Sequence, residues 1–164
     1  MNACVGRLHI REDEGMLQAI VKRKIMAVFD CLSSGDYESV LADVGKTVEH
    51  RFAGDHCLDG TRTSVESMRL WFQRLYRLFP NLSFEIHSIS VAGWPWNMTV
   101  AVEWTDHATP IDGIEYVNYG TRIIRLVFGK VVSLHAYLDI QLLINALNRM
   151  ADSGYEEAAK PPIL

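Results

Sequence analysis

Four alternating segments follow one another between residues 82 and 139, and this run constrains the fold more than any other feature. They span residues 82–91, 98–107, 115–128 and 131–139, and the turns between them are short and contain Gly, Pro or Asn. Alternation of apolar and polar residues is typical of strands with one buried face, and short turns join antiparallel neighbours. The sequence therefore predicts a four-stranded antiparallel meander.

Segments with helical spacing of apolar residues flank this meander. Residues 16–32 form a one-faced pattern, residues 64–79 are apolar on more than one side, and residues 140–150 directly follow the last strand. A short helix after Asp36 and a strand over residues 47–53 precede the second long helix. This order predicts an α+β fold, with a curved antiparallel sheet wrapped around helices and an internal pocket.

The length of 164 residues suits one domain. We expect a polar N-terminal tail over residues 1–14, a single domain over residues 15–151 and a C-terminal tail over residues 152–164. No internal repeat or low-complexity tract suggests a second domain.

Charge and cysteine usage narrow the classes of partner. The net charge of −4 comes from 20 acidic and 16 basic residues, and the basic ones are not gathered into a stripe that could neutralise phosphates. No apolar run is long enough to span a bilayer, so we expect neither nucleic acid nor membrane as a partner. Cys4, Cys31 and Cys57 are odd in number and lack metal-ligand spacing, which favours a reducing cytoplasm and predicts no bound metal.

Strand parity places several polar side chains inside the predicted pocket. A strand whose apolar residues point inward also points inward any polar residue of the same parity. This rule places Asp106 beside Val102, Asn118 beside Ile124, and His50 beside Phe52. Apolar walls with a few polar groups are typical of small-molecule sites. The residues expected to bind substrate are Phe52, Trp71, Trp104, Tyr116 and Tyr137.

Asp139 stands where the last strand meets the last helix, and two interpretations remain open. Asp is a preferred helix N-cap, and it is equally a candidate acid/base group. Similar alternatives hold for Asp106, which could cap a turn, and for His50, which could be a core histidine bonded to a carbonyl. His135 is more readily structural than catalytic.

The turn over residues 93–97 is unusually aromatic, because it contains Trp94 and Trp96. An exposed pair would indicate an interface or a lid, whereas a buried pair would indicate packing alone.

Several short motifs resemble the SnoaL-like polyketide cyclases, which belong with the nuclear transport factor 2 and ketosteroid isomerase superfamily. The resemblance covers about residues 16–150. The motifs are Val48-Glu-His50, Gly60 before the long helix, Leu78-Phe-Pro-Asn-Leu82, Val100-Ala-Val-Glu-Trp104, a Gly-Lys hairpin and a terminal Tyr137-x-Asp139. The resemblance implies a cone of curved antiparallel sheet closed by helices, often dimeric through the open face of the sheet.

The resemblance also implies roles for particular residues. Asp139 matches the catalytic acid/base of the cyclases and the water-activating base of limonene epoxide hydrolases. The segment from Glu103 to Asp106 resembles the hydrolase segment in which an Arg and an Asp complete an Asp-Arg-Asp triad, with Trp104 here in place of the Arg.

Three functions follow as hypotheses. The first is a cofactor-independent cyclase or isomerase acting on a hydrophobic carbonyl compound such as a polyketide or terpenoid, with Asp139 moving the proton. Asp106, His50 and Asn118 would then hold or protonate the oxyanion. The alternatives are epoxide hydrolase-like water addition, or a non-catalytic dimeric module that binds a small ligand.

Overall fold

The computed structural model describes residues 15–164, and the predicted tail over residues 1–14 lies outside the described residues. The helices are α1 (Met16–Ser33), α2 (Tyr37–Leu41), α3 (Val65–Leu78) and α4 (Ile140–Asp152), followed by the 3-10 helix η1 (Glu156–Ala159). The strands are β1 (Val44–Phe52), β2 (Gly60–Arg62), β3 (Ser83–Trp94), β4 (Asn97–Ala108), β5 (Tyr116–Val127) and β6 (Lys130–Leu138).

The strands form one curved, unclosed sheet in the order β2-β1-β6-β5-β4-β3. The meander predicted from the alternating segments is confirmed, because β3 to β6 pair antiparallel with their neighbours in sequence. β1 joins the meander by pairing parallel to β6, and β2 pairs antiparallel to β1. No strand was predicted over residues 60–62, because three residues are too short to show alternation.

Local sequence explains where the helices begin. Asp36 accepts the Ser39 N–H at 3.1 Å, Ser64 accepts the Ser67 N–H at 3.0 Å, and each is the N-cap of its helix. These bonds satisfy amide groups that have no partner within the first helical turn. The start of α2 after Asp36 and the start of α3 at Ser64 both agree with the sequence prediction.

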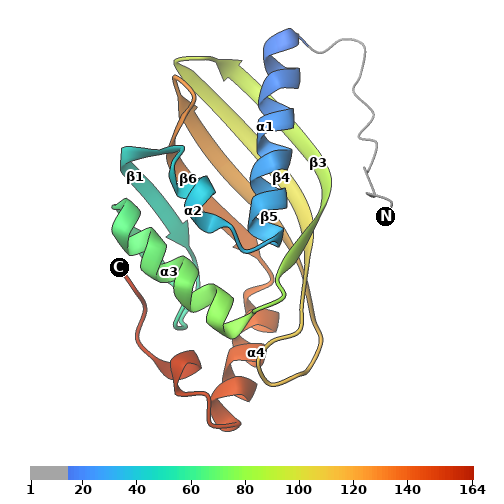
Figure 1. Cartoon of the computed structure of the whole chain (residues 1–164), viewed down its shortest axis with the longest axis vertical. Coiled ribbons are helices and arrows are strands. Elements are labelled where there is room, and N and C mark those ends of the chain that lie inside the picture. The colour runs from blue at the N-terminus through green and yellow to red at the C-terminus, as the bar shows by residue number, and fades with distance from the viewer. Residues whose placement is uncertain (1–14) are drawn as a thin grey trace.

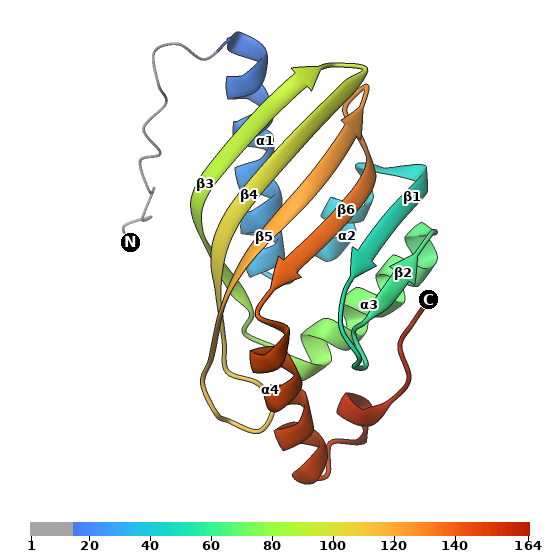
Figure 2. The same ribbon diagram turned by 180° about the vertical axis from the view of Figure 1, so that it is seen from behind.

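The helices are distributed unequally over the two faces of the sheet. Figure 1 shows α1, α2 and α3 across the concave inner face, and α4 beyond the lower end of the sheet. Figure 2 shows the outer face, over which no helix of the described residues lies. The mixed α+β architecture predicted from the sequence is confirmed. Within residues 15–164, no helix combines the length and apolar character needed to cross a membrane.

The segment predicted as a C-terminal tail is bonded to the domain. Arg62 Nη1 donates to the Ile163 carbonyl at 2.8 Å, and Arg74 Nη1 donates to the Pro161 carbonyl at 2.7 Å. Arg74 also pairs with Glu157 of η1, with Nε and Oε1 separated by 2.9 Å. Both arginines are buried, so the last residues supply acceptors for charges that water cannot reach.

Candidate functional site

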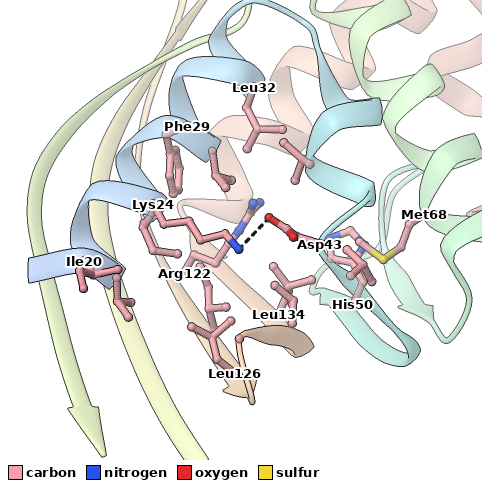
Figure 3. A pocket seen from close by; sticks show the side chains of 18 of the residues that line it. Ile20, Lys24, Phe29, Leu32, Asp43, His50, Met68, Arg122, Leu126 and Leu134 are labelled. Atoms are coloured by element: carbon pink, nitrogen blue, oxygen red, sulfur yellow. Dashed lines mark ion pairs between the residues drawn. The ribbon is translucent and has the colours of Figure 1, made fainter. Parts of the chain in front are cut away.

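An apolar cavity lies between α1, α2 and the inner face of the sheet (Figure 3), and we call it the main cavity. Its volume of about 250 Å³ is close to the lower end of the range for small-molecule sites. Most of the lining is apolar and comes from α1, β5 and β6, and the polar lining residues are Lys24, Asp43, His50 and Arg122.

The Lys24–Asp43 ion pair shows where the main cavity approaches solvent. Lys24 Nζ lies 2.9 Å from Asp43 Oδ2, as the dashed line in Figure 3 marks, and both side chains are partly exposed. Burial of a free charge is expensive, so a partly exposed ion pair lies more readily at the rim of an apolar cavity than in its depth.

A second space of about 40 Å³ lies between α3, α4 and the sheet, and we call it the small cavity. Its walls contain four of the five residues predicted to bind substrate, namely Phe52, Trp71, Trp104 and Tyr116. Arg122 lines both cavities, so it lies where they adjoin.

Asp106 lines the small cavity, as strand parity placed it among inward-facing residues of β4. Its side chain is 8% exposed, and its Oδ1 atom has no hydrogen-bond partner. Burial raises the pKa of Asp106 to about 6, because a carboxylate loses its hydration inside the protein. A carboxyl group with this pKa can exchange a proton near neutral pH.

Arg122 belongs to this site but is not among the site residues predicted from the sequence. It is 7% exposed, its Nε atom has no hydrogen-bond partner, and its guanidinium lies 5.5 Å from the ring centre of Trp104. Burial lowers the pKa of Arg122 to about 10, which still leaves it charged at neutral pH. The available signal was its parity on β5, which it shares with Ile124 and Leu126.

His50 lines the main cavity as a neutral imidazole. Its Nδ1 atom accepts a hydrogen bond from Arg62 Nε at 3.0 Å, so the neutral ring carries its hydrogen on Nε2. Burial, together with the charges of Arg62 and Arg122, holds the pKa of His50 well below its usual range. His50 can therefore donate a hydrogen bond at neutral pH without carrying charge.

Asn118 is buried, and its side-chain amide is fully used within the protein. Its Nδ2 atom donates to Tyr116 Oη at 2.7 Å and to the Asp139 carbonyl at 2.9 Å. Its Oδ1 atom accepts the N–H groups of Asp139 at 3.2 Å and Tyr119 at 2.7 Å. Two donors and two acceptor sites are the full capacity of an amide, so Asn118 has no hydrogen bond left for a substrate.

Asp139 lies outside the linings of both cavities. Its carboxylate is exposed and accepts the Leu142 N–H at 3.1 Å, which makes it the N-cap of α4. Of the two interpretations left open by the sequence, the structure therefore shows the cap, and the catalytic role stays a prediction.

Tyr137 lies on the opposite face of β6 from the cavities. It is exposed and lines an open hollow on the outer face of the sheet together with Tyr119, His87 and Glu103. Its odd-numbered parity on β6 matches that of His135, whose Nε2 atom lies 2.6 Å from Glu49 Oε1 near the surface. Strand parity thus separates Tyr137 from the other four predicted binding residues.

No group of three His, Cys, Asp or Glu side chains within residues 15–164 is arranged to hold a metal ion. Besides the Lys24–Asp43 ion pair at the rim, the ionisable groups that line the two cavities are one carboxyl, one guanidinium, one imidazole and one phenol, supplied by Asp106, Arg122, His50 and Tyr116.

Residues 25–134 match the family model described as the SnoaL-like domain. This match covers most of the chain. The protein belongs to the SnoaL-like domain family. The resemblance identified from the short sequence motifs is thereby confirmed. A search among curated proteins found no match.

Solved structures share the fold of this SnoaL-like domain at low sequence identity. An NTF2-like protein of unknown function from Burkholderia pseudomallei K96243 is 14% identical, with a TM-score of 0.69 over 76% of this chain and 95% of that chain. A candidate SnoaL-like polyketide cyclase from Jannaschia sp. CCS1 is 15% identical, with a TM-score of 0.66 over 83% and 96%. TerC, co-crystallised with polyporic acid, is 16% identical, with a TM-score of 0.67 over 76% and 95%.

The matched region of the SnoaL-like domain contains His50, Asp106 and Arg122, whereas Asp139 and α4 follow it. The interior polar groups are thus built on the part of the chain that defines the family. The junction with α4 is joined to that part by the hydrogen bonds of Asn118.

Proposed function

We propose that this protein is a cofactor-independent acid/base enzyme, of cyclase or isomerase type, that acts on a hydrophobic carbonyl compound such as a polyketide or terpenoid. The observation that carries the proposal is that Asp106 and Arg122 line the same small cavity, each with a polar atom that has no partner in the protein. Buried unpaired polar atoms are costly, and they are typical of groups kept for a ligand.

The geometry supports different roles for the two cavities, with substrate binding in the main cavity and the reaction at the small cavity. The main cavity would hold the apolar body of the substrate, with its carbonyl oxygen at Arg122, which borders both cavities. The reacting carbon would then lie toward Asp106 in the small cavity. Since these walls are apolar, an electrostatic interaction there is stronger than in water.

In this proposal the Asp106 carboxylate removes a proton from the carbon next to the carbonyl. The electron pair of the C–H bond becomes an enolate, and Arg122 stabilises the negative charge on its oxygen. In an isomerase the proton returns from Asp106 to another carbon. In a cyclase the enolate carbon forms a bond to a second carbonyl carbon, and the resulting alkoxide takes the proton.

The aromatic residues and His50 would position the substrate. Trp104 lies under the Arg122 guanidinium, while Phe52, Trp71 and Tyr116 form the apolar wall of the small cavity. The Tyr116 hydroxyl accepts a hydrogen bond from Asn118, so its own hydrogen remains available to donate. The neutral His50 offers a second uncharged donor from the side of the main cavity.

A non-catalytic ligand-binding module is the second candidate, and one observation favours it. Two of the four residues predicted to be catalytic have structural roles at the β6–α4 junction. The Asp139 side chain caps α4, and the Asn118 side chain donates to the Asp139 carbonyl. Water addition to an epoxide by a carboxylate pair has less support, because Asp139 lies outside the cavity that contains Asp106.

Proton exchange tests the proposal without knowledge of the natural substrate. The protein would be incubated in deuterium oxide with a panel of cyclic ketones and 1,3-diketones, and deuterium uptake next to the carbonyl would be followed by mass spectrometry. We expect catalysed exchange that falls by about 100-fold or more in Asp106→Asn. Arg122→Met should lose the exchange as well.

Asp139→Asn is the matched control, because Asn is also a good N-cap and the change removes only an exposed carboxylate. Full exchange activity in Asp139→Asn is expected. Loss of exchange in Asp139→Asn with retention in Asp106→Asn would assign the proton transfer to Asp139 instead. Binding of ketones without exchange in the unaltered protein would support the ligand-binding module.

A further inference from the structure

Three exposed aromatic residues gather at one end of the sheet, and we call them the aromatic tip: Trp94, Trp96 and Phe128. Trp94 and Trp96 are 66% and 58% exposed, and their rings stack with centres 5.9 Å apart. Phe128 is 75% exposed, and its N–H donates to the Pro95 carbonyl at 2.7 Å, which joins the β5–β6 turn to the β3–β4 turn. Exposure of the tryptophan pair is the case for which the sequence predicts an interface or a lid.

The backbone conformation at position 128 disfavours Phe, and so does the exposure of the side chain to solvent. Val127 and Lys130 pair in the ladder, so Phe128 and Gly129 form a two-residue turn, with φ angles of 47° and 76°. Turns of this kind need positive φ at both positions and favour Asn-Gly. At the first position of this turn, Phe is neither buried nor favoured by the backbone conformation. The presence of Phe here is therefore better explained by a contact of its side chain outside the described chain.

The described segments at this end are positively charged in a protein whose net charge is −4. Residues 16–29, 88–102 and 122–132 contain six Lys or Arg and no Asp or Glu. Four of these are exposed: Arg23, Lys24, Arg125 and Lys130. Asp43, from outside these segments, lies 2.9 Å from Lys24 and 3.7 Å from Lys130. The charge of this end is complementary to an anionic surface.

The same end carries the opening of the main cavity. Figures 1 and 2 place the start of α1 and the two turns at one end of the molecule. Ile20 of α1, exposed to solvent, lines the main cavity together with Leu126 and Gly129 beside the β5–β6 turn. An apolar ligand leaving the cavity here would meet the aromatic tip first.

The area of the tip decides between a lipid surface and a stable protein partner. Aromatic side chains bury about 150–250 Å² each in full, so three that are partly exposed offer roughly 300–500 Å². Stable protein interfaces bury about 800 Å² per partner. Lipid docking requires no such area, because Trp and Phe settle at the headgroup boundary and cations add attraction to anionic lipids.

We propose that the aromatic tip docks on an anionic lipid surface and brings the opening of the main cavity against it, so that apolar ligands pass between lipid and protein. The sequence prediction of no membrane partner rested on the lack of a spanning segment, and surface docking needs none. The inference concerns delivery of the ligand and holds whether or not Asp106 is catalytic.

Flotation of the full chain with vesicles tests this proposal. We expect binding to vesicles of phosphatidylcholine with about one third phosphatidylserine, weaker binding to phosphatidylcholine alone, and loss of binding at high salt. Trp71 and Trp104 are buried, so a blue shift of tryptophan emission on binding would report Trp94 and Trp96.

Phe128→Asn and Trp96→Ser should each weaken vesicle binding by about 10-fold, and Arg125→Gln with Lys130→Gln should reduce the preference for anionic lipid. Phe128→Asn keeps the fold, because Asn is favoured in this turn. Tyr155→Ser is the matched control, since it removes an exposed aromatic residue beside η1, away from the tip and from the face of the sheet.

Absence of flotation, or equal flotation of the tip variants and the unaltered protein, would overturn the proposal. A second outcome would also overturn it. If Phe128→Asn or Trp96→Ser lowered the molecular mass measured by light scattering and left vesicle binding unchanged, the tip would be a contact between copies of this chain.

Discussion

At the scale of single residues, two opposite charges are buried beside the small cavity. Asp106 and Arg122 line one cavity, yet Oδ1 of the acid and Nε of the base both lack a hydrogen-bond partner. A fold selected for stability alone would pair these atoms or replace them with apolar ones. Their retention is consistent with a ligand that completes the hydrogen bonding.

The raised pKa of Asp106 predicts a measurable dependence of stability on pH. Its folded pKa of about 6 exceeds the usual value of 3.8, so the folded protein holds this proton more tightly than the unfolded chain. The stabilising contribution is complete below pH 3.8 and is lost as pH rises through about 6. Two pKa units correspond to about 3 kcal/mol of unfolding free energy.

Asp106→Asn isolates this contribution. The unfolding free energy of the variant relative to the unaltered protein should rise by about 2–3 kcal/mol between about pH 4 and pH 7.5, because only the unaltered protein ionises there. Urea unfolding at the two pH values measures the difference, and any pH-independent cost of the amide cancels. A difference that does not change with pH would contradict the raised pKa.

At the scale of elements, strand parity identified the inward face of β4 correctly. The close approach of β5 limits the space that is left for the Trp104 side chain on β4. Trp104 and Gly120 are directly opposed in the ladder. A Cβ atom on Gly120 would lie 2.5 Å from the Trp104 ring, so no larger residue leaves space for the indole. The Trp104 ring in turn lies against the Arg122 guanidinium. The absence of a side chain at Gly120 therefore helps to position the positive charge of the site.

The β6–α4 junction gives a prediction that separates capping from catalysis. Asp139→Ala removes the acceptor of the Leu142 N–H and should lower the unfolding free energy by about 1 kcal/mol. Asp139→Asn should change it by only a few tenths of a kcal/mol, since both residues cap well. Thermal or urea unfolding measures both, and an equal loss in the two variants would show that the charge rather than the cap stabilises α4.

At the scale of the whole molecule, the uncovered face of the sheet is the surface on which the family resemblance implies dimerisation. Tyr119 and Tyr137 are exposed on this face beside the outer hollow. Exposed aromatic residues of this kind are typical of protein interfaces. We therefore expect a homodimer formed through the outer face.

Light scattering should give a mass of twice 18.6 kDa for the unaltered protein. Tyr137→Glu should lower the mass to that of one chain, because it places a charge in an apolar contact. Phe128→Asn, at the opposite end of β6, should leave the mass unchanged. A monomeric unaltered protein would refute the prediction.

The sequence by itself determined the long helices, the strands of the meander and the inward face of most strands, but not β2 or the outward position of Tyr137. Alternation and helical spacing are local properties, so the meander, the long helices and the inward positions of His50, Asp106 and Asn118 could be read from them. The same rules placed Phe52, Trp104 and Tyr116 in the interior. Parity also contained the signal for Arg122.

Only the tertiary structure decided which of these side chains remain available for chemistry. Hydrogen bonds between distant segments commit Asn118 to Asp139, Arg62 to His50 and Arg74 to the C-terminal segment. Such bonds depend on how the sheet curves and on where α4 and η1 lie. Neither can be predicted from the spacing of residues along the chain. For that reason the sequence predicted that Asp139 moves the proton, whereas in space its carboxylate caps α4.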